Sequence, residues 1–178
     1  MESTVKISKK DFSDTLYCWL SELLTEKEVR NIANEVGFTI KGFLRKKTNK
    51  KLYDKFYGEL FSLNMYLIVF TCEGIIKDED KKNDVLDLFH STVYERNIKV
   101  TGISYSKWIR LMKLIYNEYS KSMDTESLLT PLLLIANKFG KNLFGKTKLD
   151  PFVKFEIGMR IGGIVKYLSE ALQEYDIE

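Results

Sequence analysis

The chain has 178 residues, 44% of them hydrophobic and 30% charged, and its formal net charge is +3. This length and apolar content are enough for one well-filled core, so they favour a single domain over residues 1–178 and exclude a disordered chain. The small net charge argues only weakly for an anionic partner. The two cysteines, Cys18 and Cys72, have no CxxC spacing, which is typical of reduced thiols in a cytoplasmic protein.

The start of the sequence and its most apolar run bear on export and membranes. The N-terminal sequence MESTVKISKKDF lacks the apolar stretch of a signal peptide. The most apolar run, residues 60–76, is shorter than the roughly 20 residues of a membrane-spanning helix and contains Asn64 and Glu73. We therefore expect a cytoplasmic protein without a transmembrane segment.

Apolar residues at spacings of three and four predict the first two helices. The first helix carries Phe12, Leu16, Trp19, Leu20 and Leu23 on one side. Thr25 and Glu28 then form the S/T-x-x-E pattern of a capping box, which predicts that a second helix begins there. The apolar face of this helix continues through residue 44, so we expect the helix to run on past Gly37.

The third predicted helix, residues 51–74, is apolar on nearly its whole circumference. Only a narrow polar strip remains, around Lys55, Glu59 and Ser62. A helix of this kind must be surrounded by other helices, so we place it at the centre of the fold. Asn64 projects among its apolar residues, where a buried amide needs hydrogen-bond partners. It is either a structural pin or the polar end of a pocket.

A fourth and a fifth helix are predicted in the middle of the chain. The fourth follows the acidic residues 78–80 and ends near Asn97. The connector of residues 97–104 has no helical pattern and can hold a short extended piece. Ser104 or Ser106 can cap the fifth helix, which has Tyr116 on its buried face.

The two prolines, Pro131 and Pro151, each stand where a helix can begin, because the first turn leaves its N–H groups unpaired. Asp150 is the cap of the last helix, which we expect to end near Glu174. No segment shows the two-residue alternation of a strand, and no repeat or sustained heptad pattern occurs. The sequence therefore predicts an all-α fold, a single-domain bundle of about seven helices around the buried helix 51–74.

Motifs of the common catalytic and metal sites are missing from the sequence. It has no phosphate-binding glycine loop, no G-x-S-x-G and no H-E-x-x-H. One histidine cannot supply a two-histidine metal site from a single chain. A calcium loop starting at Asp78 would need glycine at Asn83 and glutamate at Phe89. We therefore predict no catalytic residues, no metal site and no cofactor.

The single histidine, His90, lies on the fourth helix together with Asp87 and Tyr94. Their spacing puts the three on one side of the helix, where they could take part in acid–base chemistry. That side projects away from the apolar stripe of Val85, Leu88 and Phe89. We therefore interpret the trio as part of a solvent-exposed face.

The densest positive charge is a loop with five basic residues in seven positions. These residues are Arg45, Lys46, Lys47, Lys50 and Lys51. Such a cluster can contact phosphates. It contains no aromatic residue for base stacking, and lysine-rich loops are commonly only a soluble surface. Nucleic acid or an anionic membrane surface is therefore a less favoured partner.

The last helix has a second face of small and apolar residues. Gly158 and Gly162 project together with Phe155 and Met159, away from the face of Ile157. Glycine inside a helix costs about 1 kcal/mol relative to alanine, so its presence suggests a close approach by another group. Close packing of two helices within the chain is the preferred interpretation. A homodimer or partner interface and a ligand pocket are the alternatives.

Three hypotheses of function remain, and no set of motifs typical of a known family decides among them. The preferred one is a non-enzymatic helical interaction module, a regulatory or assembly protein that binds a protein partner or a second copy of itself. The second is binding of nucleic acid or an anionic surface through the basic loop at 45–51. The third is a small-ligand binder or enzyme with a pocket between helices, in which Asn64 and His90 supply polar groups.

Overall fold

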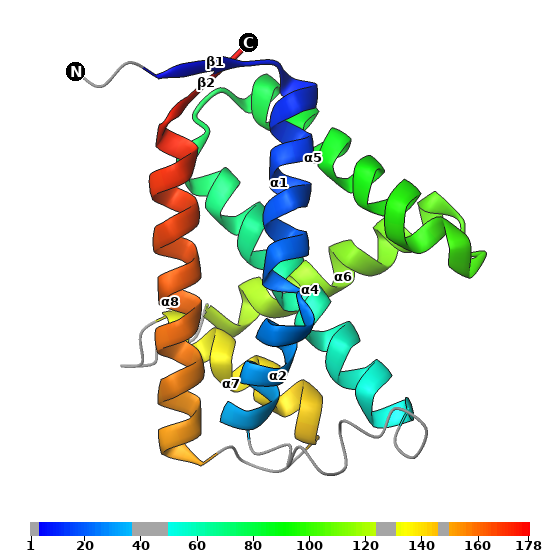
Figure 1. The fold of residues 1–178 in the computed structure, drawn as a ribbon, viewed down its shortest axis with the longest axis vertical. Coiled ribbons are helices and arrows are strands. Elements are labelled where there is room, and N and C mark those ends of the chain that lie inside the picture. Colours follow the sequence, from blue (N-terminus) through cyan, green and yellow to red (C-terminus); the bar gives the residue numbers. More distant parts are fainter. Residues whose placement is uncertain (1–3, 37–49, 124–130, 146–149) are drawn as a thin grey trace.

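The computed structural model describes residues 4–36, 50–123, 131–145 and 150–178, and α-helices dominate them (Figure 1). In chain order the elements are β1 (Val5–Ile7), α1 (Lys9–Leu23), α2 (Glu26–Glu35), α4 (Lys50–Ile75), α5 (Glu79–Val93), the π-helix η1 (Tyr94–Ile98), the 3-10 helix η2 (Lys99–Thr101), α6 (Tyr105–Met123), α7 (Pro131–Phe144), α8 (Pro151–Gln173) and β2 (Tyr175–Ile177). The seven α-helices of the described ranges confirm the predicted all-α bundle.

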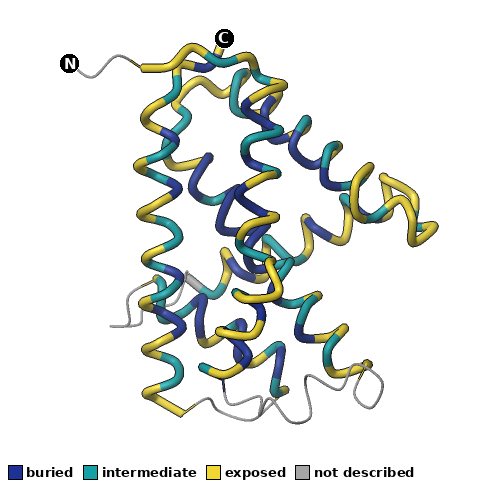
Figure 2. Tube along the Cα trace, viewed as in Figure 1, coloured by how far each residue is buried: buried dark blue, intermediate teal, exposed yellow. Residues whose placement is uncertain are grey.

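Helix α4 lies at the centre of the bundle, as its apolar circumference predicted. Residues 63–69 are all buried, and seven consecutive residues make about two helical turns, so neighbours cover every face of this segment. Figure 2 shows the buried stretch in the middle of the molecule. The helix begins at Lys50, one residue before the predicted start at Lys51.

The core consists of two hydrophobic clusters, and α4 contributes to both. The first cluster joins α1, α5, α6 and the C-terminal half of α8, and its α4 members are Met65, Ile68, Val69 and Cys72. The second joins α2, α7, the N-terminal half of α8 and Tyr119 of α6, and its α4 members are Phe56, Leu60, Leu63, Tyr66 and Leu67. Burial raises the pKa of the Cys72 thiol to about 12, so Cys72 acts as a small apolar core residue.

Side-chain caps begin the helices at the positions predicted for α2 and α8. The Thr25 hydroxyl accepts a hydrogen bond from the Glu28 backbone N–H at 3.4 Å. An Asp150 carboxylate oxygen accepts from the backbone N–H of Phe152 at 2.8 Å, and Pro151 occupies the first turn. The Glu28 carboxylate binds Arg160 on α8, so Glu28 links α2 to its neighbour.

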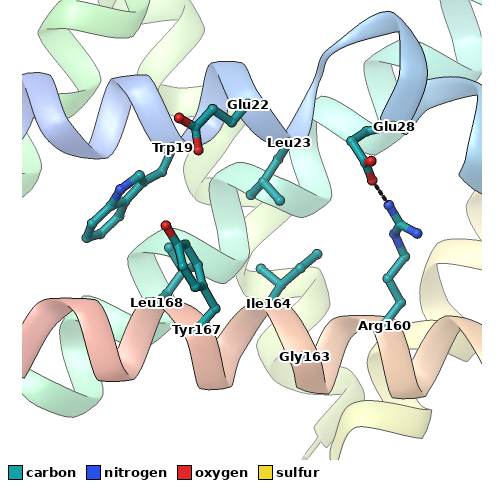
Figure 3. A pocket seen from close by; sticks show the side chains of 9 residues that line it. All are labelled: Trp19, Glu22, Leu23, Glu28, Arg160, Gly163, Ile164, Tyr167 and Leu168. Atoms are coloured by element: carbon teal, nitrogen blue, oxygen red, sulfur yellow. Dashed lines mark hydrogen bonds and ion pairs between the residues drawn. The ribbon is translucent and has the colours of Figure 1, made fainter.

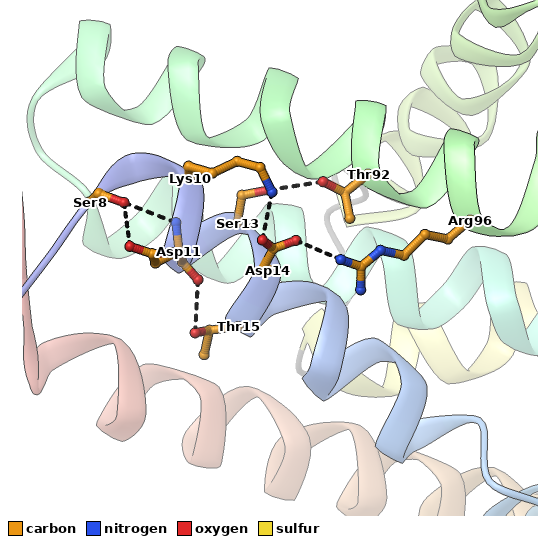
Figure 4. Close-up of polar contacts among 8 residues, drawn as sticks. All are labelled: Ser8, Lys10, Asp11, Ser13, Asp14, Thr15, Thr92 and Arg96. Atoms are coloured by element: carbon orange, nitrogen blue, oxygen red, sulfur yellow. Dashed lines mark hydrogen bonds and ion pairs between the residues drawn. The ribbon is translucent and has the colours of Figure 1, made fainter.

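Polar contacts along one side of α1 attach it to α5 and η1 (Figure 4). The Asp14 carboxylate accepts from Lys10 at 2.5 Å and from the Arg96 guanidinium at 3.1 Å. Arg96 also lies over the Tyr17 ring, 4.6 Å from its centroid. These exposed contacts contribute little to stability, so α1 is held mainly by the buried apolar residues beneath them.

Two predicted segments differ from the structure. Helix α2 ends at Glu35, so the predicted continuous helix past Gly37 is wrong, and residues 37–49 lie outside the described ranges. The connector after α5, predicted to hold an extended piece, is helical through η1 and η2. Gly102 then ends η2 with a φ of +78°, a conformation that glycine adopts without strain.

A small sheet that the sequence did not predict joins the two ends of the described chain. Strands β1 and β2 are parallel, with Val5 opposite Tyr175 and Ile7 opposite Ile177. Each strand has three residues, which is too short for an alternating pattern to stand out. Ile177 is buried in the first core cluster, so the sheet fastens the end of α8 over α1.

The glycines of α8 have different surroundings. A Cβ atom on Gly158 would lie 2.6 Å from Leu133 Cδ2, and one on Gly162 would lie 3.0 Å from Leu132 Cδ1. Both glycines therefore let α7 approach α8 closely. A Cβ atom on Gly163 would meet no atom within 4 Å.

This difference predicts opposite effects of two leucine substitutions on stability. Gly158→Leu should lower the free energy of unfolding by about 1–3 kcal/mol, because the new side chain overpacks the contact with α7. Gly163→Leu should leave it unchanged or raise it by up to about 1 kcal/mol, because the helix gains propensity without a clash. Urea unfolding of both variants and the wild type measures the effects. Equal stability of the two variants would contradict the packing described for α7 and α8.

Candidate ligand-binding site

A cavity of about 510 Å³ lies between α4, α5 and α6, and we call it the His90 pocket. Its lining residues are Val69, Glu73, Asn83, Leu86, Asp87, His90, Tyr105, Ile109, Met112, Lys113 and Tyr116. Buried apolar side chains and the polar groups of His90 and Tyr116 thus line one pocket that opens to solvent on one side. Small-molecule sites in proteins have this combination of an apolar wall and a few placed polar groups.

His90 is buried in this pocket, with only 8% of its surface exposed. The interpretation of the His90 side of α5 as a solvent-exposed face is therefore wrong. The inward face of α5 includes Leu86 and His90, whereas Leu88 is only partly buried. The physical reason is that α6 packs on this side of α5, so that Trp108 and Tyr116 contact the imidazole ring.

The hydrogen bonds of His90 determine which nitrogen carries the proton. Nδ1 lies 2.6 Å from the backbone carbonyl oxygen of Leu86, and a carbonyl oxygen can only accept, so Nδ1 is the donor. In the neutral ring Nε2 then has a free lone pair and accepts from the Tyr116 hydroxyl at 3.0 Å. The pair places two uncharged polar groups side by side in the pocket.

Burial keeps both members of the pair uncharged near neutral pH. It lowers the pKa of His90, an effect that the Leu86 hydrogen bond and the Asp87 charge oppose and that Lys113 reinforces. Burial also raises the pKa of Tyr116, and the nearby Glu73 carboxylate adds to the shift. Three charged residues, Glu73, Asp87 and Lys113, are exposed, so they form the rim of the pocket.

The sequence did not indicate the pairing of His90 with Tyr116. The apolar spacing of α6 placed Tyr116 on a buried face, and its hydroxyl is indeed buried. The pairing itself was not predictable from local spacing, because 26 residues separate Tyr116 from His90. Tyr94, expected beside His90, donates to the Ile103 carbonyl oxygen at 2.9 Å and does not line the pocket. Asp87 does line it.

Asn64, the other polar residue expected in a pocket, lies outside the His90 pocket. It is 1% exposed, and its Nδ2 donates to the Leu23 carbonyl oxygen at 3.4 Å. Leu23 is the last residue of α1, where helical carbonyl groups have no partner within the helix. Asn64 therefore pins the end of α1 to α4.

The remaining predicted residues are spread over the surface and the α7–α8 contact. Lys50 and Lys51 are exposed at the start of α4, whereas Arg45, Lys46 and Lys47 lie outside the described residues. Phe155 and Met159, which were expected on the same face of α8 as Gly158, are exposed, whereas Gly158 is buried. The predicted residues therefore do not form one site.

In residues 4–36, 50–123, 131–145 and 150–178, no three His, Cys, Asp or Glu side chains are grouped in a way that could hold a metal ion. No helix of these ranges has both the length and the hydropathy needed to cross a membrane.

Comparisons of the chain with protein-family models, with curated proteins and with solved structures found no match. No activity, ligand or partner is therefore transferred to this chain from another protein. The function has to be argued from the geometry of the site itself.

The buried imidazole predicts that folding stability depends on pH. The unfolded chain binds a proton at His90 with a pKa near 6.5, whereas the folded chain resists protonation. Lowering the pH from 7.5 to 5.5 should therefore favour the unfolded state, by at most about 1.4 kcal/mol per pH unit for one proton. Urea unfolding at several pH values should show this loss in the wild type and a smaller loss in His90→Gln.

The chain has one histidine, so proton NMR of the folded protein gives a single imidazole C2–H signal. We expect this signal to titrate below the pKa of a free histidine. Titration at or above that value, or an equal pH dependence of stability in the wild type and His90→Gln, would contradict the neutral, buried state of His90.

Proposed function

We propose that this protein binds a small molecule in the His90 pocket. The observation that carries the proposal is the uncharged pair of the buried His90 and the partly buried Tyr116, which lies in a pocket with an apolar interior and a charged rim. Buried polar groups that only stabilise a fold are normally surrounded by packed side chains. Here the space beside the pair is large enough for a compact organic molecule.

The chemistry of the pair favours a ligand with an apolar body and an uncharged hydroxyl group. The Tyr116 hydroxyl donates a hydrogen bond to His90, so its oxygen keeps lone pairs that can accept from a ligand hydroxyl. Val69, Leu86 and Met112 offer apolar contacts to the rest of the ligand. A charged group would lose its hydration beside this neutral pair, whereas a hydroxyl needs only one new hydrogen bond.

The compound p-cresol is a suitable probe, because it combines an apolar ring with one hydroxyl. Titration with p-cresol should move the single imidazole C2–H signal of His90 to saturation. Toluene, which lacks the hydroxyl, should bind about fivefold more weakly, the difference expected from one hydrogen bond. Tyr116→Phe should remove this preference, because it deletes the accepting oxygen and keeps the ring.

Two tryptophan substitutions on α6 test the location of binding. Ile109 lines the pocket, so Ile109→Trp should place an indole in the cavity and abolish binding of p-cresol. Leu111 is 50% exposed and does not line the pocket, so Leu111→Trp should leave binding unchanged. Absence of a saturable shift in the wild type, or equal binding by both variants, would contradict the proposal.

A second candidate function is self-association through α8. Phe152, Phe155 and Met159 are 69%, 52% and 63% exposed, and their spacing of three and four residues puts them on one stripe. Exposed apolar residues grouped in this way are typical of interaction surfaces. This candidate retains the predicted interaction module, with the exposed side chains of α8 as its contact surface.

Multi-angle light scattering over a range of protein concentrations tests self-association. We expect the wild type to exceed the mass of one chain and Phe155→Glu to reduce the mass to that of a monomer, because the new carboxylate would have to be buried at the contact. Leu111→Glu, at an exposed apolar position on α6, is the matched control. A wild type that remains monomeric at every concentration would exclude this candidate.

A further inference from the structure

A second cavity, of about 420 Å³, lies between α1, α2 and α8 (Figure 3). We call it the Trp19 pocket. Leu23 and Ile164 form its apolar middle, with Trp19, Tyr167 and Leu168 at one end and Arg160 at the other. None of these residues lines the His90 pocket, so the two cavities are separate.

The positive charge in the Trp19 pocket is already balanced. The Arg160 guanidinium forms ion pairs with Glu28 and with Glu35, the latter at 3.2 Å. Two carboxylates on α2 thus neutralise the one basic residue that lines the pocket. An anionic ligand such as a carboxylate would find no unpaired cation here and would face net negative charge.

The opposite end of the pocket has the groups that bind organic cations. Trp19 and Tyr167 lie edge to face with ring centroids 6.3 Å apart. Figure 3 shows the Glu22 carboxylate near this end, and no cation of the described residues forms an ion pair with it. Aromatic rings and a carboxylate together attract an ammonium group, through the negative faces of the rings and through its charge.

Gly163 keeps the floor of the pocket open. A Cβ atom at this position would meet no atom within 4 Å, unlike Cβ atoms on Gly158 and Gly162, which would contact α7. Helix packing therefore does not explain glycine here, although glycine costs about 1 kcal/mol relative to alanine inside a helix. A longer side chain at position 163 would occupy the cavity.

From these contacts we propose that the Trp19 pocket binds an organic ammonium ion with an apolar body. The ammonium group lies among Glu22, Trp19 and Tyr167, and the apolar body extends over Gly163 along Ile164. This site adds a second ligand class to the neutral hydroxyl compound proposed for the His90 pocket. Because the two cavities share no lining residue, failure of either proposal leaves the other standing.

Hexylammonium is the probe, with hexanol and hexanoate as neutral and anionic counterparts of the same length. The chain has two tryptophans, so the indole N–H signal of Trp19 is assigned by comparison with Trp108→Phe. Hexylammonium should shift the Trp19 signal to saturation. Hexanol should bind about fivefold more weakly, and hexanoate should not bind.

Three variants separate binding at this site from general effects on the protein. Glu22→Gln should weaken hexylammonium binding about two- to fivefold and leave hexanol binding unchanged. Gly163→Leu should abolish binding of both probes while the protein stays folded. Gly58→Leu, which also adds a side chain in open space on a helix but lines neither cavity, should bind normally.

Three results would overturn the proposal. One is the absence of a saturable Trp19 shift with hexylammonium in the wild type. Another is equal affinity for hexylammonium, hexanol and hexanoate, which would show that charge is not recognised. The third is normal hexylammonium binding by a folded Gly163→Leu variant, which would place the probe elsewhere.

Discussion

The burial of α4 on all sides is the constraint on which the rest of the structure depends. Residues 63–69 expose almost no surface, so helices must cover α4 in every direction. Its side chains divide between two hydrophobic clusters, one shared with α1 and α5 and the other with α2 and α7, and α6 contributes to both. Helix α8 closes both clusters, because its C-terminal half belongs to the first and its N-terminal half to the second.

This arrangement also determines where cavities can remain. Neighbouring helices meet around α4 without filling all the space between them, and the two cavities lie where three helices meet at a time. Polar groups that enter this interior must find partners there. The Asn64 amide nitrogen does so at the end of α1, although Asn64 Oδ1 has no hydrogen-bond partner in the described part of the chain, and His90 does so with Leu86 and Tyr116. The second arrangement borders the His90 pocket, which makes it the candidate binding site.

The sequence predicted the elements whose signals are local. The caps at Thr25 and Asp150, the prolines and the apolar circumference of α4 depend on residues within a few turns, and all appear where expected. The inward position of His90 could not be predicted in this way, because it depends on α6 packing beside α5. The apolar spacing of α5 predicted an inward face that differs from the observed one by about one residue position. This difference is enough to place His90 on the outward side in the prediction.

The candidate site was predictable only in part for the same reason. The sequence singled out His90 as an unusual residue and Tyr116 as one with an inward-facing spacing, but it offered no distance between two helices. The exposure of Phe155 and Met159 and the open space over Gly163 likewise depend on which helices pack against α8. Periodicity describes one helix at a time, whereas a pocket is a property of several.

The central claim is that the space beside His90 and Tyr116 is a preformed binding site. A crystal structure of the protein soaked with p-cresol tests it most directly. The account predicts density for one ring between Val69, Ile109 and Met112, with its oxygen within hydrogen-bond distance of Tyr116. An empty or side-chain-filled cavity, with p-cresol bound only elsewhere on the molecule, would contradict it.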